Sequence, residues 1–142
     1  MGMPVMKMLV VDDSQTMLLM IRKHLQAMGF SNEQILTCNS GQQAINILDV
    51  TGIQLVLLDW HIPDLSGLDI LKIIKNYRKR TIPVIMITTE QERKNIAKAI
   101  DSGVDDYLIK PVDPVKLCEK IIRIGRKYGF ELPGFKDPGH VD

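Results

Sequence analysis

The chain has 142 residues and a formal net charge of +1, and aromatic residues make up only 5% of it. This length suits one domain of ordinary size, and the weak net charge offers no strong attraction to nucleic acid or to an anionic membrane. We therefore expect protein partners. The sequence contains no apolar stretch of membrane-spanning length and no signal-peptide core near its start, so we predict a cytoplasmic protein.

Short apolar runs alternate with longer stretches of helical period, which is the pattern of βα units around a parallel sheet buried on both faces. The first run predicts a strand at Met8–Val11. A helix follows, which Ser14 is placed to cap and Gly29 to end. The next unit is predicted as a strand at 34–38 and a helix at 41–49.

The second half of the chain continues this alternation. We predict strands at 55–59, 83–87 and 106–109, each followed by a helix, at 66–80, at 90–102 and from Pro114 onward. From Tyr128 the sequence is rich in Gly and Pro and has no period, which predicts an irregular tail over residues 128–142. Residues 1–5 are assigned to an N-terminal extension, and we expect no linker to a further domain.

Polar side chains follow four of the five predicted strands, at the point where each strand ends. Asp12 and Asp13 follow the first strand, Asp59 the third, Thr88 the fourth and Lys110 the fifth. In an open parallel sheet, ligands bind outside the carboxyl ends of the strands. Carboxylates gathered there repel one another unless a divalent cation compensates their charge, and Mg²⁺ is the natural choice because it prefers oxygen ligands.

Four stretches of sequence carry a resemblance to a known family. VVDDSQTM, LLDWHIPDLSG, MITTE and YLIKP resemble the receiver domains of two-component response regulators, and the single-domain chemotaxis regulators most of all. The resemblance covers residues 6–127. It implies an α/β fold of the flavodoxin-like, doubly wound (βα)5 type, with a five-stranded parallel sheet in the order 2-1-3-4-5. It also implies a cis bond between Lys110 and Pro111.

The resemblance implies a metal site and a phosphoacceptor. Asp59 is then the nucleophile that forms an aspartyl phosphate. Asp13 and Asp59 bind Mg²⁺ directly, Asp12 acts mainly through a bound water, and the backbone carbonyl of His61 completes the protein's share of the ligands.

The resemblance implies three further roles at the strand ends. Lys110 neutralises one phosphoryl oxygen, and the hydroxyl of Thr88 donates to another. Tyr107 turns inward when Thr88 moves, which remodels the face formed by the fourth helix, the fifth strand and the fifth helix.

Two positions depart from the pattern expected of a chemotaxis regulator. The side chain at His61 varies among receivers and borders the path of the attacking water, so the lifetime of the phosphorylated state does not carry over. Thr89 stands where many receivers have Ala or Gly. We hypothesise that its bulk slows access of a phosphodonor or phosphatase to Asp59.

The expected function is that of a stand-alone signalling switch. A histidine kinase donates the phosphoryl group, and a protein effector or phosphatase docks on the switched face of a monomer or weak dimer. The chain is expected to catalyse its own phosphorylation and autodephosphorylation without being a turnover enzyme; a phosphatase would need a second Asp where His61 stands.

Two alternatives stay open. One is a phosphorelay shuttle that passes phosphate to a phosphotransfer histidine domain, and the other is a receiver-like interaction module that works without phosphorylation. No nucleic-acid or membrane partner is expected. We predict that a run of five basic residues forms a solvated helix face rather than an RNA-binding patch. They are Lys72, Lys75, Arg78, Lys79 and Arg80.

Overall fold

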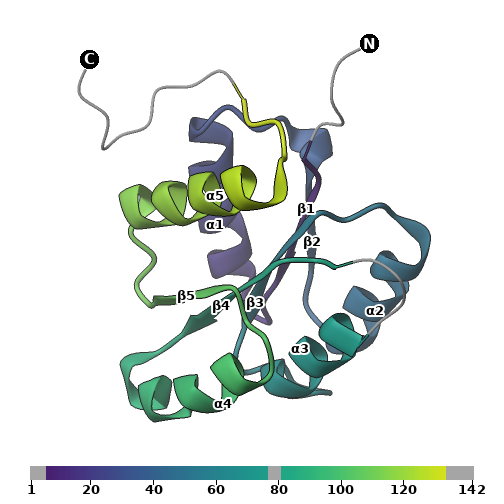
Figure 1. Ribbon diagram of the computed structural model, residues 1–142, viewed down its shortest axis with the longest axis vertical. Coiled ribbons are helices and arrows are strands. Elements are labelled where there is room, and N and C mark those ends of the chain that lie inside the picture. The colour runs from purple at the N-terminus through teal and green to yellow at the C-terminus, as the bar shows by residue number, and fades with distance from the viewer. Residues whose placement is uncertain (1–5, 77–80, 134–142) are drawn as a thin grey trace.

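A five-stranded parallel sheet forms the centre of the computed structural model, which describes residues 6–76 and 81–133 (Figure 1). Its strands are β1 (Met8–Val11), β2 (Ile35–Cys38), β3 (Leu55–Asp59), β4 (Val84–Thr88) and β5 (Asp106–Ile109). They lie in the order β2-β1-β3-β4-β5, and every neighbouring pair is parallel. The predicted flavodoxin-like fold is therefore confirmed.

Helices cover both faces of this sheet (Figure 1). The helices α1 (Gln15–Ala27) and α5 (Pro114–Tyr128) pack on one face, and α2 (Gly41–Val50), α3 (Gly67–Asn76) and α4 (Ile96–Asp101) pack on the other. Each face has its own apolar core, because successive strand side chains point to opposite sides. Within the part of the chain described, no helix is long and apolar enough to cross a membrane.

Local signals explain where α1 and α5 begin and where α5 ends. The Ser14 side chain accepts a hydrogen bond from the Met17 amide at 3.2 Å, and Asp113 accepts one from the Val115 amide at 2.8 Å. These side chains satisfy amide groups that have no partner within the helix. Gly129 follows α5 with a φ of 73°, a left-handed conformation that favours glycine.

The predicted helix at 90–102 is divided in two, which corrects the prediction. Residues Glu90–Asn95 form a 3-10 helix, η2, and only Ile96–Asp101 are α-helical. A second 3-10 helix, η1 (Asn32–Gln34), precedes β2. The sequence of η2 is polar throughout and has no apolar face to pack as an α-helix, so its first turn closes through the bond from the Glu92 amide to the Thr89 carbonyl, at 3.1 Å.

The segment after α5 begins in an ordered way. Tyr128 is the last helical residue, its hydroxyl donates to Asp105 at 2.5 Å, and its ring stacks on Phe130 with 6.0 Å between centroids. Leu132 packs against Gly125, within the core on the α1 and α5 side. The predicted irregular tail is thus wrong only at Tyr128, which is helical; residues 129–133 belong to no helix or strand, as predicted, and 134–142 lie outside the described residues.

The predicted solvated basic face is wrong at Lys75. Its ammonium nitrogen lies 2.6 Å from an oxygen of Asp105 and donates to the Ile82 carbonyl at 3.0 Å, so the side chain is largely buried. Lys72 is exposed, as predicted. The other predicted members of that face, and the end of the helix predicted at 66–80, fall in 77–80, outside the described residues.

Candidate acidic site at the carboxyl end of the sheet

Three aspartates meet where the neighbouring strands β1 and β3 end. Val11 lies opposite Leu58 in the parallel register, so Asp12, Asp13 and Asp59 come to the same edge of the sheet. One carboxylate oxygen from each lies within 4.8 Å of the others. Asp12 and Asp59 are buried, at 1% and 4% exposure, while Asp13 is exposed. The predicted convergence of these carboxylates is therefore observed.

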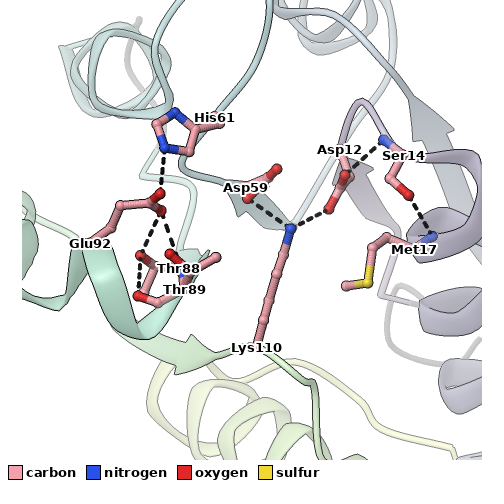
Figure 2. A network of polar contacts seen from close by, with 9 residues as sticks. All are labelled: Asp12, Ser14, Met17, Asp59, His61, Thr88, Thr89, Glu92 and Lys110. Atoms are coloured by element: carbon pink, nitrogen blue, oxygen red, sulfur yellow. Dashed lines mark hydrogen bonds and ion pairs between the residues drawn. The ribbon is translucent and has the colours of Figure 1, made fainter.

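Lys110 reaches this cluster from the end of β5 (Figure 2). Its ammonium nitrogen lies 3.2 Å from Oδ1 of Asp59 and 3.3 Å from Oδ2 of Asp12. Its backbone amide donates to the Thr88 carbonyl at 2.7 Å, which fixes the start of the side chain beside β4. The following bond to Pro111 is cis, as the resemblance predicted.

The charges of the cluster shift its protonation. Burial, and then the charge of Asp12, raise the pKa of Asp59 to about 6, although Lys110 opposes the change. Burial disfavours the charged form of Lys110, but the carboxylates of Asp59 and Asp12 outweigh it and raise the pKa of the ammonium group. Lys110 therefore stays a cation at neutral pH, and it compensates only part of the negative charge.

The donor set suits a hard divalent cation. Oδ1 of Asp12 accepts a hydrogen bond from the Ser14 amide at 2.9 Å. The other oxygen, Oδ2, is buried and receives no hydrogen bond from the described residues, although the ammonium of Lys110 lies beside it. The single positive charge of Lys110 faces three carboxylates, so negative charge remains that a bound cation would compensate. Together with Asp13 and Asp59, Asp12 offers the oxygen ligands that Mg²⁺ prefers.

The loop after β3 is held tightly against the site. The Trp60 amide donates to the Ile87 carbonyl at 3.0 Å, and the Gly67 amide donates to the Trp60 carbonyl at 2.8 Å. A Cβ atom on Gly67 would lie 2.5 Å from the carbonyl oxygen of Asp59, so only glycine allows this approach. The loop carries His61, whose predicted role as a backbone metal ligand stays a prediction.

A second polar network lies beside Asp59 and is centred on Glu92 (Figure 2). One carboxylate oxygen of Glu92 contacts Nε2 of His61, and the other lies 3.3 Å from the Thr88 hydroxyl and 3.5 Å from the Thr89 amide. Our reading of the sequence missed Glu92. The spacing Thr89-x-x-Glu92, which is that of a capping box, was the available signal.

Tyr107 lies on β5, which is separated by β4 from the strand β3 that carries Asp59. It is half-buried, and the Lys120 ammonium nitrogen is 5.5 Å from the centroid of its ring. Tyr107 lines a groove together with Pro111 and with charged residues of α5, among them Lys116 and Arg123. The groove runs along β5 and α5, on the face where the switch was predicted.

Residues 8–122 match the family model of the response regulator receiver domain. Chemotaxis protein CheY1 of Helicobacter pylori is 40% identical over 118 residues, which are 82% of this chain and 94% of that protein. Chemotaxis protein CheY-3 of Vibrio cholerae is 36% identical over 120 residues, 84% of this chain and 91% of that protein.

A solved structure is also similar. The BeF3-activated DrrB receiver domain superposes with a TM-score of 0.74 at 30% sequence identity, and the match covers 87% of this chain and 99% of that one.

Proposed function

This chain belongs to the family of response regulator receiver domains, of the chemotaxis type found in two-component systems, and we propose that its Asp59 accepts a phosphoryl group from a histidine kinase. Receiver domains are signalling switches. The observation that carries the proposal is the position of Asp59, which ends β3 beside two further aspartates and 3.2 Å from the ammonium nitrogen of Lys110.

The reaction requires an oxygen of Asp59 to attack phosphorus while the bond from phosphorus to the donor nitrogen breaks and the imidazole leaves. Asp12, Asp13, Asp59 and the carbonyl of His61 would hold Mg²⁺, which would neutralise charge on the phosphoryl oxygens. Lys110 stabilises negative charge next to Asp59. The hydroxyl of Thr88 is the proposed donor to a further phosphoryl oxygen.

The proposed output is binding of a protein effector through the face of α4, β5 and α5. The half-buried Tyr107 and the groove beside it support this assignment, because an aromatic ring at the edge of a groove can change the groove's shape by turning. We assign the protein to the cytoplasm, where its kinase domain partner would be found, and propose that it acts as a monomer or weak dimer.

Trp60 follows Asp59 directly and provides a reporter for the test. Fluorescence is recorded during titration with Mg²⁺ and then with acetyl phosphate, for the wild type and for Asp59→Asn, and intact mass is measured in parallel. We expect a change with each addition and one added phosphate, with the phosphate-dependent effects lost in the variant. A wild-type chain that gains no phosphate would overturn the proposal and leave a phosphorylation-independent interaction module.

A further inference from the structure

The Thr88 hydroxyl already has acceptors in this structure. Its Oγ1 lies 3.3 Å from a carboxylate oxygen of Glu92 and 3.3 Å from the carbonyl oxygen of Thr89. Thr88 is buried, at 2% exposure, so water does not readily replace these partners. A hydroxyl group has one hydrogen to donate, and these two acceptors, the Glu92 carboxylate and the Thr89 carbonyl, compete for it (Figure 2).

Glu92 is held in place to receive this hydrogen bond. Its second carboxylate oxygen contacts Nε2 of His61, which projects from the loop after β3, and its backbone amide is bound to Thr89 at 3.1 Å. The side chain is only 14% exposed. Burial alone would raise the pKa of this carboxyl, but hydrogen bonds from His61 and Thr89 lower it overall. Glu92 is thus an ionised acceptor at neutral pH.

The proposed phosphorylated state makes a conflicting demand. There the single hydrogen of Thr88 is donated to a phosphoryl oxygen on Asp59, and it cannot serve Glu92 at the same time. Hydrogen bonds to ionised acceptors are stronger than those to neutral ones. Breaking the bond between the Thr88 hydroxyl and the Glu92 carboxylate therefore has a free-energy cost. That cost must be met by the bond to the phosphoryl group.

We propose that Glu92 is a positioning residue that acts through Thr88: it holds the Thr88 hydroxyl in the unphosphorylated orientation and so biases the switch toward its inactive state. This inference rests on the proposed function, because it concerns how the same phosphoryl site is regulated. His61 assists, since it contacts the Glu92 carboxylate from the loop after β3. We call the contacts that join His61, Glu92 and Thr88 the latch. No sequence motif of the metal or phosphoryl site includes Glu92.

The latch predicts that loss of the carboxylate favours the phosphorylated state. The test measures the apparent affinity for beryllofluoride, a stable stand-in for the phosphoryl group, by fluorine NMR and Trp60 fluorescence at saturating Mg²⁺. We expect Glu92→Gln, which replaces an ionised acceptor by a weaker, neutral one, to bind about two- to tenfold more tightly than the wild type. Glu92→Ala, which has no acceptor, is expected to gain at least as much. Damage to the fold would weaken binding instead.

A second comparison separates the hydrogen bond from simple charge repulsion. In a Thr88→Ala background the hydroxyl is absent, so Glu92→Gln should no longer change the affinity. Glu33→Gln is the matched control, because Glu33 is an exposed glutamate in η1, outside the polar networks of the site, and its loss should have no effect.

The outcomes are distinct. If the wild type binds beryllofluoride but Glu92→Gln binds equally well or more weakly, the latch is excluded and the proposed function stands. An equal gain in the Thr88→Ala background also excludes the latch, because the effect would then come from charge alone. Failure of the wild type to bind beryllofluoride would overturn the proposed function together with the latch.

Discussion

The ammonium nitrogen of Lys110 lies 3.2 Å from the carboxylate of Asp59, although the two residues are 51 positions apart and end different strands. The same nitrogen is 3.3 Å from Asp12. Lys110 thus lies on the side of the carboxylates that a divalent cation would also approach. This position makes Lys110 both a partner for phosphate and a competitor for Mg²⁺.

Replacing Lys110 should therefore separate metal binding from phosphorylation. We expect Lys110→Met to bind Mg²⁺ more tightly by about tenfold, or ~1.4 kcal/mol, because a repelling charge is removed. Phosphorylation by acetyl phosphate should become slower, since no cation replaces the ammonium group. Trp60 fluorescence at about pH 8 measures the first effect, and mass spectrometry measures the second. Weaker Mg²⁺ binding in Lys110→Met would contradict this account of the site.

The raised pKa of Asp59 predicts that the site destabilises the metal-free protein. Its pKa is about 6 in the folded chain against 3.8 for an ordinary Asp, so the folded state holds this proton more tightly than the unfolded state. The contribution of Asp59 to stability therefore falls as pH rises from about 4 to about 6, and it is constant above that range. At neutral pH the cost is ~3 kcal/mol at most.

Asp59→Asn should remove most of this cost. In urea denaturation with chelator present, we expect the variant to be more stable than the wild type by ~2 kcal/mol at about pH 7.5, and the gain should shrink toward zero near pH 4. Asp69→Asn, an exposed aspartate in α3, is the control and should change stability little. The prediction fails if Asp59→Asn loses stability at neutral pH.

The strands and the acidic site could be predicted because their signals are local. A strand buried on both faces is a continuous apolar run, and the polar residue that follows it must lie at the carboxyl edge of the sheet. The positions of Asp12, Asp59 and Lys110 could be predicted from this rule and the strand order alone. The resemblance supplied the strand order, which the structure confirms.

The features that escaped prediction depend on contacts between distant segments. Lys75 looked like a solvated lysine because its partner, Asp105, is 30 positions away. Glu92 lies in the polar run of η2, where no apolar period distinguishes one charged residue from another. Tyr128 looked like the start of a tail, since its hydrogen bond to Asp105 leaves no trace in the local sequence. Such pairs form only once segments that are distant in the sequence have packed together.

Substitution of Thr89 can test whether the bulk of its side chain limits phosphorylation and dephosphorylation of Asp59. Its Oγ1 is buried and has no hydrogen-bond partner within the described residues, so the hydroxyl gives little in return for the space that it takes. We expect Thr89→Ala to speed both phosphorylation by acetyl phosphate and hydrolysis by about threefold, a change of ~0.7 kcal/mol in the barrier. Thr89→Val keeps the bulk and should behave like the wild type. Equal rates in Thr89→Ala and wild type would refute the role of bulk.

The contact between Tyr128 and Asp105 predicts where the stable domain ends. Asp105 accepts hydrogen bonds from the Tyr128 hydroxyl at 2.5 Å, from the Val84 amide at 2.8 Å and from the Lys75 ammonium at 2.6 Å. Burial raises the pKa of the Tyr128 hydroxyl to about 12, so this group remains a donor at neutral pH. Tyr128→Phe leaves one buried carboxylate oxygen without this donor. We expect a loss of ~1–2 kcal/mol in urea denaturation.

The same contact distinguishes two shortened chains. A chain that ends at residue 127 loses Tyr128, Phe130 and Leu132 together, all of which pack on the core between α1 and α5. It should be less stable than a chain that ends at residue 133 by more than the Tyr128→Phe variant loses, because apolar burial is lost as well as a hydrogen bond. Equal stability of the two shortened chains would place the end of the domain at residue 127, as the sequence predicted.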